Sequence, residues 1–186
     1  MLNYNSPIND TKKYSEIEIS EIEPIIKLNL RGKNRDFITK VGKILSIIPP
    51  ADPNTSSGND NLNIIWLSPD EWMIYSNDKN TLNDSSNLED KLFNETLKAN
   101  LGSVSNVTDH WIMINLRGNK VFELLSAGCP FKFNDFMNSK GATTQTLLNH
   151  VDVIIHNKNI NDLNLFVRRS FSNHLWSWIN DTASRL

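Results

Sequence analysis

Cysteine, glycine and long apolar runs are scarce in this sequence, and each scarcity excludes a class of protein. The 186 residues contain one cysteine, so neither an intrachain disulfide framework nor a cysteine-rich metal site can form. The seven glycines are scattered and match neither the Gly-x-Gly-x-x-Gly pattern of dinucleotide-binding proteins nor the Gly-x-x-x-x-Gly-Lys-Ser/Thr pattern of phosphate-binding loops. No apolar run approaches the roughly 18 residues that a membrane-spanning helix needs, and the polar N-terminus lacks the apolar stretch of a signal peptide. We therefore expect a cytoplasmic protein that does not bind membranes.

An excess of either charge is also missing. The 19 Lys and Arg residues nearly balance the 21 Asp and Glu residues, which gives a formal net charge of −2. This balance disfavours a protein that binds nucleic acids or anionic membranes through general charge attraction. Hydrophobic residues make up 39% of the chain, enough to bury a core, so a wholly disordered chain is excluded.

The residue types that most often carry catalysis or metal binding form no recognisable site. The four histidines lie far apart in the sequence and show no metal-binding spacing. Cys129 lies at the C-terminal end of a predicted helix, where the helix dipole does not favour a reactive thiolate, so we interpret it as a buried structural residue. Residue chemistry therefore predicts no catalytic, cofactor-binding or metal-binding residue in this chain.

The pattern of apolar residues is typical of an α+β protein. Residues 1–22 are predicted to form an N-terminal arm, which is loose or closes as an edge strand or a partner contact. Apolar positions three and four residues apart, among them Phe37, Val41 and Ile48, predict a helix over residues 33–48. Strands are predicted at 25–30, 62–67, 72–75, 104–116 (with a break near 109–110), 143–155 and 163–167, and further helices at 86–100, 121–125 and 170–184.

A repeated pentapeptide divides residues 23–186 into two halves. Residues 28–32 read Leu-Asn-Leu-Arg-Gly and residues 114–118 read Ile-Asn-Leu-Arg-Gly, and each pentapeptide ends a predicted strand before an amphipathic helix. The order of strand, glycine turn, helix, strands and helix then recurs in both halves. We therefore predict two pseudo-repeated strand–helix–strand halves, about 23–108 and 109–186, with antiparallel or mixed sheets in one body.

Two groups of charged residues are candidates for contacts with a ligand or partner. Asp70 and Glu71 are adjacent carboxylates in a predicted hairpin turn, and neighbouring residues of a strand point to opposite faces. We interpret them as residues that fix the turn or bind an arginine on another element, rather than as an acid–base pair. Arg31 and Arg117 each precede a turn glycine and have two interpretations: anion binding at the start of a helix, or salt bridges within the chain or at an interface.

The last predicted helix adds further candidates. Arg168 and Arg169 precede it and have the same two interpretations as the other arginine pair. Its core face is predicted to include Phe171, Leu175, Trp178 and Ile179. Trp176 then lies on the flank, where a large aromatic residue anchors a partner or is covered by a loop. The predicted subunit-interface candidates are therefore Trp176, Arg168, Arg169, Arg117, Asp70 and Glu71.

Three motifs in this chain together resemble one family. They are the hairpin 66–72 (Trp-Leu-Ser-Pro-Asp-Glu-Trp), the Gly-Cys-Pro of 128–130, and Arg-Ser-Phe at 169–171 followed by Leu-Trp-Ser-Trp at 175–178. In this order, and over about residues 25–182, they resemble the gamma subunit of heterotetrameric sarcosine oxidase. The sequence departs from the family pattern at Ser68, where the family usually has glycine.

This resemblance implies a fold similar to the folate-binding domain of the glycine-cleavage aminomethyltransferases, and membership of a complex of four different chains. Such complexes convert sarcosine, tetrahydrofolate and oxygen into glycine, 5,10-methylenetetrahydrofolate and hydrogen peroxide. The resemblance places FAD, covalent FMN, NAD, tetrahydrofolate and zinc in the partner subunits alpha, beta and delta. This chain is then expected to be a non-catalytic subunit that holds the flavin- and folate-bearing subunits in register.

Two other functions stay open at this point. A free-standing folate-dependent protein, similar to the aminomethyltransferases, would need an acidic residue in a deep pocket, and Asp109 and Asp70 are the candidates for it. The second is a general interaction module with no role in sarcosine metabolism.

Overall fold

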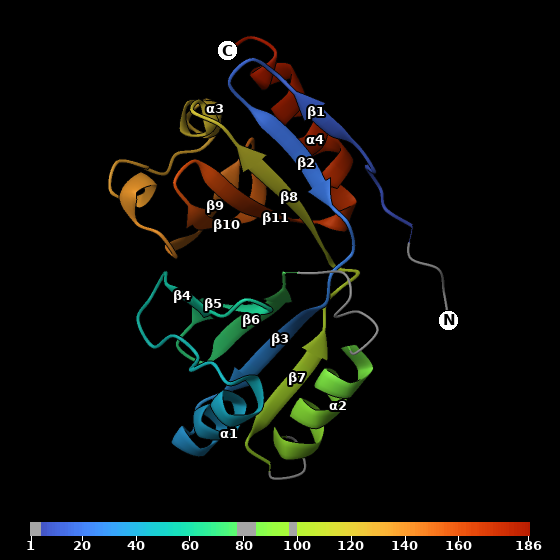
Figure 1. Cartoon of the computed structure of the whole chain (residues 1–186), viewed down its shortest axis with the longest axis vertical. Helices are drawn as coiled ribbons and strands as arrows, with labels where there is room; N and C mark the ends of the chain where they lie inside the picture. The colour runs from blue at the N-terminus through green and yellow to red at the C-terminus, as the bar shows by residue number, and fades with distance from the viewer. Residues whose placement is uncertain (1–4, 78–84, 97–99) are drawn as a thin grey trace. The chain divides into compact units, whose positions relative to one another are not determined.

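The computed structural model describes residues 5–77, 85–96 and 100–186 (Figure 1). The chain forms two compact units. Unit 1 comprises Met1–Pro24 and Asp109–Leu186, and unit 2 comprises Ile25–Thr108. Each unit contains an antiparallel sheet with helices, so the expected α+β class is confirmed.

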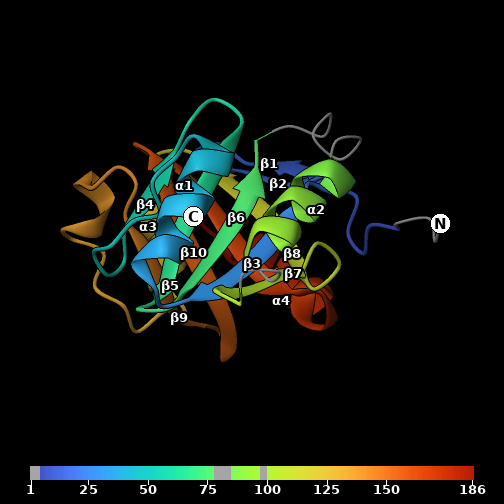
Figure 2. The ribbon, with the colours of Figure 1, turned by 90° about the horizontal axis from the view of Figure 1, so that it is seen from below.

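Unit 2 contains, within the described residues, a five-stranded sheet in the order β4-β5-β6-β3-β7. Its strands are β3 (Lys27–Gly32), β4 (Ser56–Gly58), β5 (Leu62–Ser68), β6 (Glu71–Ser76) and β7 (Gly102–Asn106). Helices α1 (Arg35–Leu45) and α2 (Ser85–Thr96) lie over one face of this sheet (Figure 2). The core between them includes Phe37 and Val41 of α1, Leu92 of α2, and Leu30 of β3, each fully buried.

Helix α1 is shorter than the sequence predicts, and this difference changes the place of Ile48. The helix ends at Leu45 because Ser46 adopts the left-handed conformation, with φ at 55°. The chain after Ser46 no longer follows the helical period, so Ile48 leaves the apolar face and is 77% exposed. The prediction that Ile48 belongs to the buried stripe is therefore wrong, whereas Phe37 and Val41 are buried as predicted.

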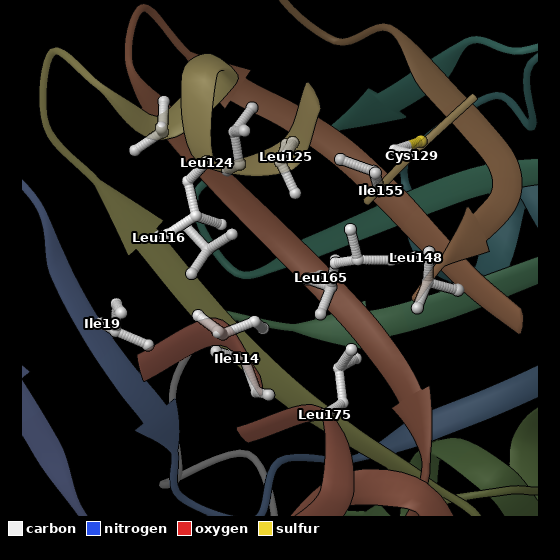
Figure 3. Close-up of a cluster of buried hydrophobic side chains, with 14 of the residues drawn as sticks. Ile19, Ile114, Leu116, Leu124, Leu125, Cys129, Leu148, Ile155, Leu165 and Leu175 are labelled. Atoms are coloured by element: carbon white, nitrogen blue, oxygen red, sulfur yellow. The ribbon is translucent and has the colours of Figure 1, made fainter. Parts of the chain in front are cut away.

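Unit 1 contains, in the part of the chain that the structure describes, a six-stranded sheet in the order β1-β2-β8-β11-β10-β9. Its strands are β1 (Thr11–Lys13), β2 (Glu18–Ile22), β8 (Trp111–Arg117), β9 (Thr143–Leu148), β10 (Val151–Asn159) and β11 (Asp162–Arg168). Its helices are α3 (Val121–Ser126), α4 (Ser172–Ala183) and the two 3₁₀ helices η2 (Phe136–Asn138) and η3 (Arg169–Phe171). Leu116 of β8, Leu125 of α3, Leu165 of β11 and Leu175 of α4 meet in the core of this unit (Figure 3).

The strand predicted at 143–155 is a hairpin in the structure. Strands β9 and β10 pair with each other, and Asn149 and His150 form the turn with φ values of 48° and 65°. Two consecutive residues with positive φ are the requirement of the tight hairpin turn whose twist matches that of the flanking strands. Asparagine tolerates this conformation better than most residues, so Asn149 was the local signal for the turn.

The N-terminal residues form strands in place of a loose arm, and β1 is an edge strand of the sheet, which was one of the alternatives from the sequence. Strand β2 lies inside the sheet, between β1 and β8, and Ile17 and Ile19 are buried in the core of unit 1. Strand β8 pairs with β11 on one side, and β2 supplies the hydrogen-bond partners for the backbone groups on its other side. The alternation of Ile17 and Ile19 matches the two-residue period of a strand with one face on a core.

The two sheets follow the same strand plan. In both, the strand of the pentapeptide repeat (β3 in unit 2, β8 in unit 1) pairs on one side with the second strand of a hairpin, β6 or β11. On its other side it pairs with β7 in unit 2 and with β2 in unit 1. The pseudo-repeat that the sequence predicts is therefore present, and in unit 1 the N-terminus of the chain supplies the strand that β7 supplies in unit 2.

Candidate functional site

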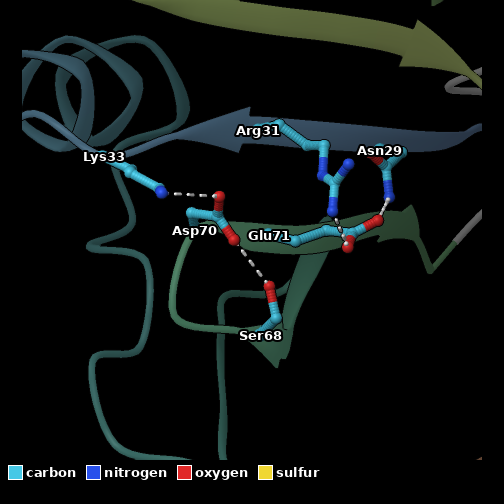
Figure 4. Close-up of polar contacts among 6 residues, drawn as sticks. All are labelled: Asn29, Arg31, Lys33, Ser68, Asp70 and Glu71. Atoms are coloured by element: carbon cyan, nitrogen blue, oxygen red, sulfur yellow. Dashed lines mark hydrogen bonds and ion pairs between the residues drawn. The ribbon is translucent and has the colours of Figure 1, made fainter.

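The candidate carboxylates of unit 2, Asp70 and Glu71, have separate partners in the hairpin between β5 and β6 (Figure 4). Asp70 accepts a hydrogen bond from the Ser68 hydroxyl at 2.9 Å, and its other oxygen lies 3.8 Å from Lys33 Nζ. Glu71 accepts from Asn29 Nδ2 at 2.7 Å and from Arg31 Nη2 at 3.0 Å. Two carboxylates with different partners do not share a proton, which agrees with the interpretation that they fix the turn and bind an arginine.

The electrostatics of Asp70 are those of an ionised surface carboxylate. The hydrogen bond from Ser68 lowers the pKa of Asp70 below its usual value, and the positive charge of Lys33 acts in the same direction. A general acid needs the opposite shift, because it must hold its proton near neutral pH. Asp70 is therefore suited to fixing the hairpin and not to donating a proton.

The candidate Arg117 has the equivalent arrangement in unit 1. Its Nε lies 3.2 Å from Asp162 Oδ2, and Asn115 Nδ2 donates to the other oxygen of Asp162 at 2.7 Å. Arg117 and Asp162 are direct partners in the β8–β11 register, as Arg31 and Glu71 are in the β3–β6 register. Of the two interpretations of these arginines, the structure shows the salt bridge within the chain. The Arg117 side chain is still 57% exposed, so it also presents a surface.

The candidates Arg168 and Arg169 lie at the opposite end of β8 from Arg117, because Arg168 is the register partner of Trp111, the first residue of β8. Arg169 is fixed by two contacts: its backbone amide donates to the His110 carbonyl at 2.9 Å, and its guanidinium donates to the Asn5 carbonyl. The Arg168 side chain is exposed. Both arginines line an open hollow of about 610 Å³, which sequence reasoning did not anticipate.

The candidate Trp176 is half-buried on α4 and packs against the core of unit 1. The face of α4 that is fully buried contains Leu175 and Ile179, as predicted, whereas Trp178 packs on the core but is only half-buried. Phe171 is not part of it: this residue ends η3, before α4 begins, and it is 48% exposed. The prediction that Phe171 belongs to the core face is therefore wrong, because the helical period starts only at Ser172.

The residues that carry the three motifs have structural contacts. Trp72 is buried in the core of unit 2, and its Nε1 donates to the Pro50 carbonyl at 2.8 Å. Gly128 leaves room for the ring of Trp178, because a Cβ built on it would lie 2.5 Å from Trp178 Cζ2. The second and third motifs therefore touch each other. Cys129, which follows, is buried with its Sγ 3.6 Å from Thr146 Oγ1.

The other metal-binding residue types do not gather into a metal site within the described part of the chain. Among the described residues, no three His, Cys, Asp or Glu side chains gather in a way that could hold a metal ion. His156 is buried in β10, and burial lowers its pKa to about 4, so it is neutral at physiological pH. No helix of the described residues is long and apolar enough to cross a membrane.

Comparison with solved structures establishes the fold. Heterotetrameric sarcosine oxidase from Corynebacterium sp. U-96, in complex with pyrrole 2-carboxylate, matches with a TM-score of 0.81 and 19% identity, over 91% of this chain and 84% of that chain. Aminomethyltransferase T of the glycine cleavage system from Bartonella henselae matches with a TM-score of 0.63 and 13% identity. That match covers 91% of this chain but only 49% of the transferase, so this chain spans about half its length.

Comparison with protein families identifies the relationship. A search against curated protein sequences gives no match. The family model of the sarcosine oxidase gamma subunit, however, matches residues 33–185, which is most of the chain and includes all three motifs. The resemblance expected from the sequence is therefore confirmed, and the chain belongs to the sarcosine oxidase gamma subunit family.

Proposed function

We propose that this chain is a non-catalytic subunit of a heterotetrameric sarcosine oxidase and holds the flavin- and folate-bearing subunits in register. The observation that carries the proposal is the family match over residues 33–185. The similarity in fold to a chain of such an oxidase, with a TM-score of 0.81, supports it. In this proposal the partners are the alpha, beta and delta subunits, and the complex works in the cytoplasm.

The proposed complex converts sarcosine, tetrahydrofolate and oxygen into glycine, 5,10-methylenetetrahydrofolate and hydrogen peroxide. FAD, FMN, NAD, tetrahydrofolate and zinc belong to the partner subunits. Three of the residues that carry the family motifs, Trp72, Gly128 and Trp178, contact the interior of their own unit, which supports a structural role for this chain. Residues 169–171 of the third motif line the open hollow instead.

Five of the six candidate residues serve this function in two ways. Asp70, Glu71 and Arg117 already bind partners within their own unit, so they offer a partner subunit fixed charges on a rigid strand end. Arg168 is exposed at the rim of a hollow, and Trp176 presents part of its ring at the surface of α4. Large aromatic and arginine side chains contribute most of the binding energy in many interfaces, so these two are the stronger candidates.

Co-purification from the cells that produce the protein tests the proposal. The chain, carrying an affinity tag, is expected to bring down three further chains and the absorbance of bound flavin. A strain with the tag on an unrelated protein is the control. Recovery of the chain alone, as a monomer without flavin, would contradict the proposal.

Folate titration separates this proposal from a free-standing folate-dependent enzyme. That alternative needs a carboxylate in a deep pocket, whereas Asp70 lies in a surface turn and Asp109 is exposed at the rim of an open hollow. We expect calorimetry to detect saturable tetrahydrofolate binding by the complex and none by the isolated chain. Saturable binding by the isolated chain that is lost in Asp109→Asn would favour the enzyme instead.

A further inference from the structure

The hollow beside Arg168 is lined by three separate segments of unit 1. Pro7 comes from the N-terminal segment, Asp109 and His110 precede β8, and residues of the continuous stretch 168–173 connect the end of β11 to the start of α4. Its volume is about 610 Å³, enough to receive several side chains of another protein. The main chain around it is tied together: the Arg169 amide donates to the His110 carbonyl at 2.9 Å, and the Arg169 carbonyl accepts from the Ser172 hydroxyl at 2.8 Å.

The charge of this hollow is predominantly positive. Among the described residues that line it, Arg168 and Arg169 are two cations and Asp109 is the single carboxylate. Arg31, Arg117 and Arg185 each pair with a carboxylate of their own unit, at 3.0, 3.2 and 2.7 Å. Among the described residues, Arg168 has no such carboxylate partner, although its side chain is exposed. Its guanidinium is therefore available to a carboxylate from outside the chain.

The hollow also presents an aromatic surface. Phe171 is 48% exposed even though a residue of this type is normally buried. Phe171 ends η3 and lines the hollow together with the two arginines. His110, which also lines the hollow, packs edge-on against Trp111, with ring centroids 5.2 Å apart, so its ring is held in place by a neighbour. Side chains that are already ordered before binding lose less conformational entropy when a partner binds.

We propose that this hollow receives an acidic segment of a partner subunit, with a carboxylate paired to Arg168 and an adjacent apolar side chain packed on Phe171. This inference rests on the proposed function, because the partner is a subunit of the same complex. Charge complementarity selects the acidic segment: a basic segment would face two guanidiniums, and a purely apolar one would leave Arg168 desolvated without a partner.

Charge reversal in the assembled complex tests this inference. Arg168→Glu is expected to lower recovery of the partner subunits on the tagged chain at least tenfold, and Phe171→Ala is expected to lower it as well. Lys140→Glu is the matched control, because Lys140 is an exposed cation of unit 1 that does not line the hollow. It is expected to assemble like the wild type. Circular dichroism of each variant chain checks that it is folded.

The outcomes distinguish this inference from the function on which it rests. If the wild type assembles and both Arg168→Glu and Phe171→Ala assemble equally well, the hollow is not the docking site, while the proposed function stands. If the wild type brings down no partner, the proposed function itself fails. An equal loss in Lys140→Glu would overturn the inference too, since any change of net charge would then explain the result.

A photo-crosslinking amino acid in place of Phe171 identifies the occupant. Mass spectrometry of the crosslinked complex is expected to find a partner peptide with at least one Asp or Glu next to an apolar residue. A crosslinked peptide that is basic or without carboxylates would overturn the inference.

Discussion

Arg117 faces Asp162 across the β8–β11 pair in unit 1, with its Nε 3.2 Å from the carboxylate. Arg31 faces Glu71 across β3–β6 in unit 2 in the same register. In both units the residue two positions before the arginine, Asn115 or Asn29, donates to the same carboxylate at 2.7 Å. The pentapeptide repeat thus forms the same interaction twice, here called the strand-end device: an asparagine and an arginine of one strand both bind a carboxylate on the neighbouring strand.

The glycine that follows each arginine belongs to the same device. The Gly32 amide donates to the Asp70 carbonyl at 3.0 Å, and the Gly118 amide donates to the Asn161 carbonyl at 3.0 Å. In each case the acceptor precedes the acidic residue. Each strand end is therefore held to the neighbouring hairpin by backbone and side chain together, which fixes the register of the pairing.

Asp162→Asn tests the contribution of this device to stability. We expect the free energy of unfolding to fall by about 1 kcal/mol, because the change weakens one partly buried ion pair and one hydrogen bond, while Asn115 keeps other acceptors. Urea unfolding measures the change. Asp181→Asn, which weakens the exposed pair with Arg185, is the control and should cost less than about 0.5 kcal/mol. Equal effects would show that the device adds no stability beyond a surface pair.

Two glycine substitutions should change stability in opposite directions. Gly118 has φ at 125°, and a Cβ there would lie 2.0 Å from the Glu16 carbonyl oxygen, so Gly118→Ala should destabilise the chain by about 2 kcal/mol or more. Gly42 lies within α1 and its nearest neighbour would be 3.6 Å from a Cβ, so Gly42→Ala should stabilise it by about 0.5–1 kcal/mol. Thermal unfolding of both variants measures whether each change raises or lowers stability. A Gly118→Ala variant as stable as the wild type would contradict the close approach of residue 16 to Gly118.

The buried His156 predicts a pH dependence of folding. Burial is the main cause that lowers its pKa to about 4 from 6.5, and the charge of Lys158 adds to it. Between about pH 6.5 and pH 4 the unfolded chain binds a proton at His156 that the folded chain does not, so stability is full above this range and falls as the pH drops through it. The loss from this residue should reach about 3 kcal/mol near pH 4.

Urea unfolding from pH 7.5 to pH 4.5 measures this dependence. His156→Gln is the control, since it removes the titrating group and should flatten the part of the curve that His156 contributes. A wild type and a variant with the same slope between pH 6.5 and pH 4.5 would show that His156 is protonated in the folded chain at these pH values.

Trp176→Ala tests whether the flank of α4 contributes to assembly. Because Trp176 is half-buried, we expect the isolated chain to stay folded, with weaker recovery of partner subunits in the co-purification. Leu175→Ala is the contrasting variant: Leu175 is fully buried, so its truncation should cost about 2–5 kcal/mol of folding free energy. Circular dichroism and size-exclusion chromatography distinguish the two effects. If Trp176→Ala unfolds the isolated chain, Trp176 is a core residue and not an interface residue.

Elements defined by local pattern were predictable. The apolar spacing that places Phe37 and Val41 on one face of α1, and Leu175 and Ile179 on one face of α4, follows from the helical period alone. Element ends were less predictable. Helix α1 ends because Ser46 adopts a left-handed backbone conformation, and the apolar period contains no signal for this end. The period alone therefore assigns Ile48 to the buried face of the helix, whereas the residue is exposed beyond the helix end.

Two arginines of the hollow were candidates from the sequence, but the hollow itself was not predictable. The sequence identified Arg168 and Arg169, yet their neighbours His110 and Pro7 are distant in the chain and reach them only through the β8–β11 pairing and the N-terminal segment. The exposure of Phe171 was also missed, because the residue was counted into a helix that begins one position later.

The sequence by itself determined the α+β class, the repeated strand–turn–helix order and the family, because these depend on local periodicity and on residue types at fixed spacing. Only the tertiary structure decided that β2, from the N-terminus, pairs with β8 in the place that β7 takes beside β3. Strands pair through backbone hydrogen-bonding groups that nearly every residue carries, and the paired strands can be far apart in the sequence. Local sequence patterns therefore do not specify which strands pair. The same pairing decides which charged residues form ion pairs. It brings Asp162 next to Arg117, and it leaves Arg168 exposed in the hollow that Phe171 also lines.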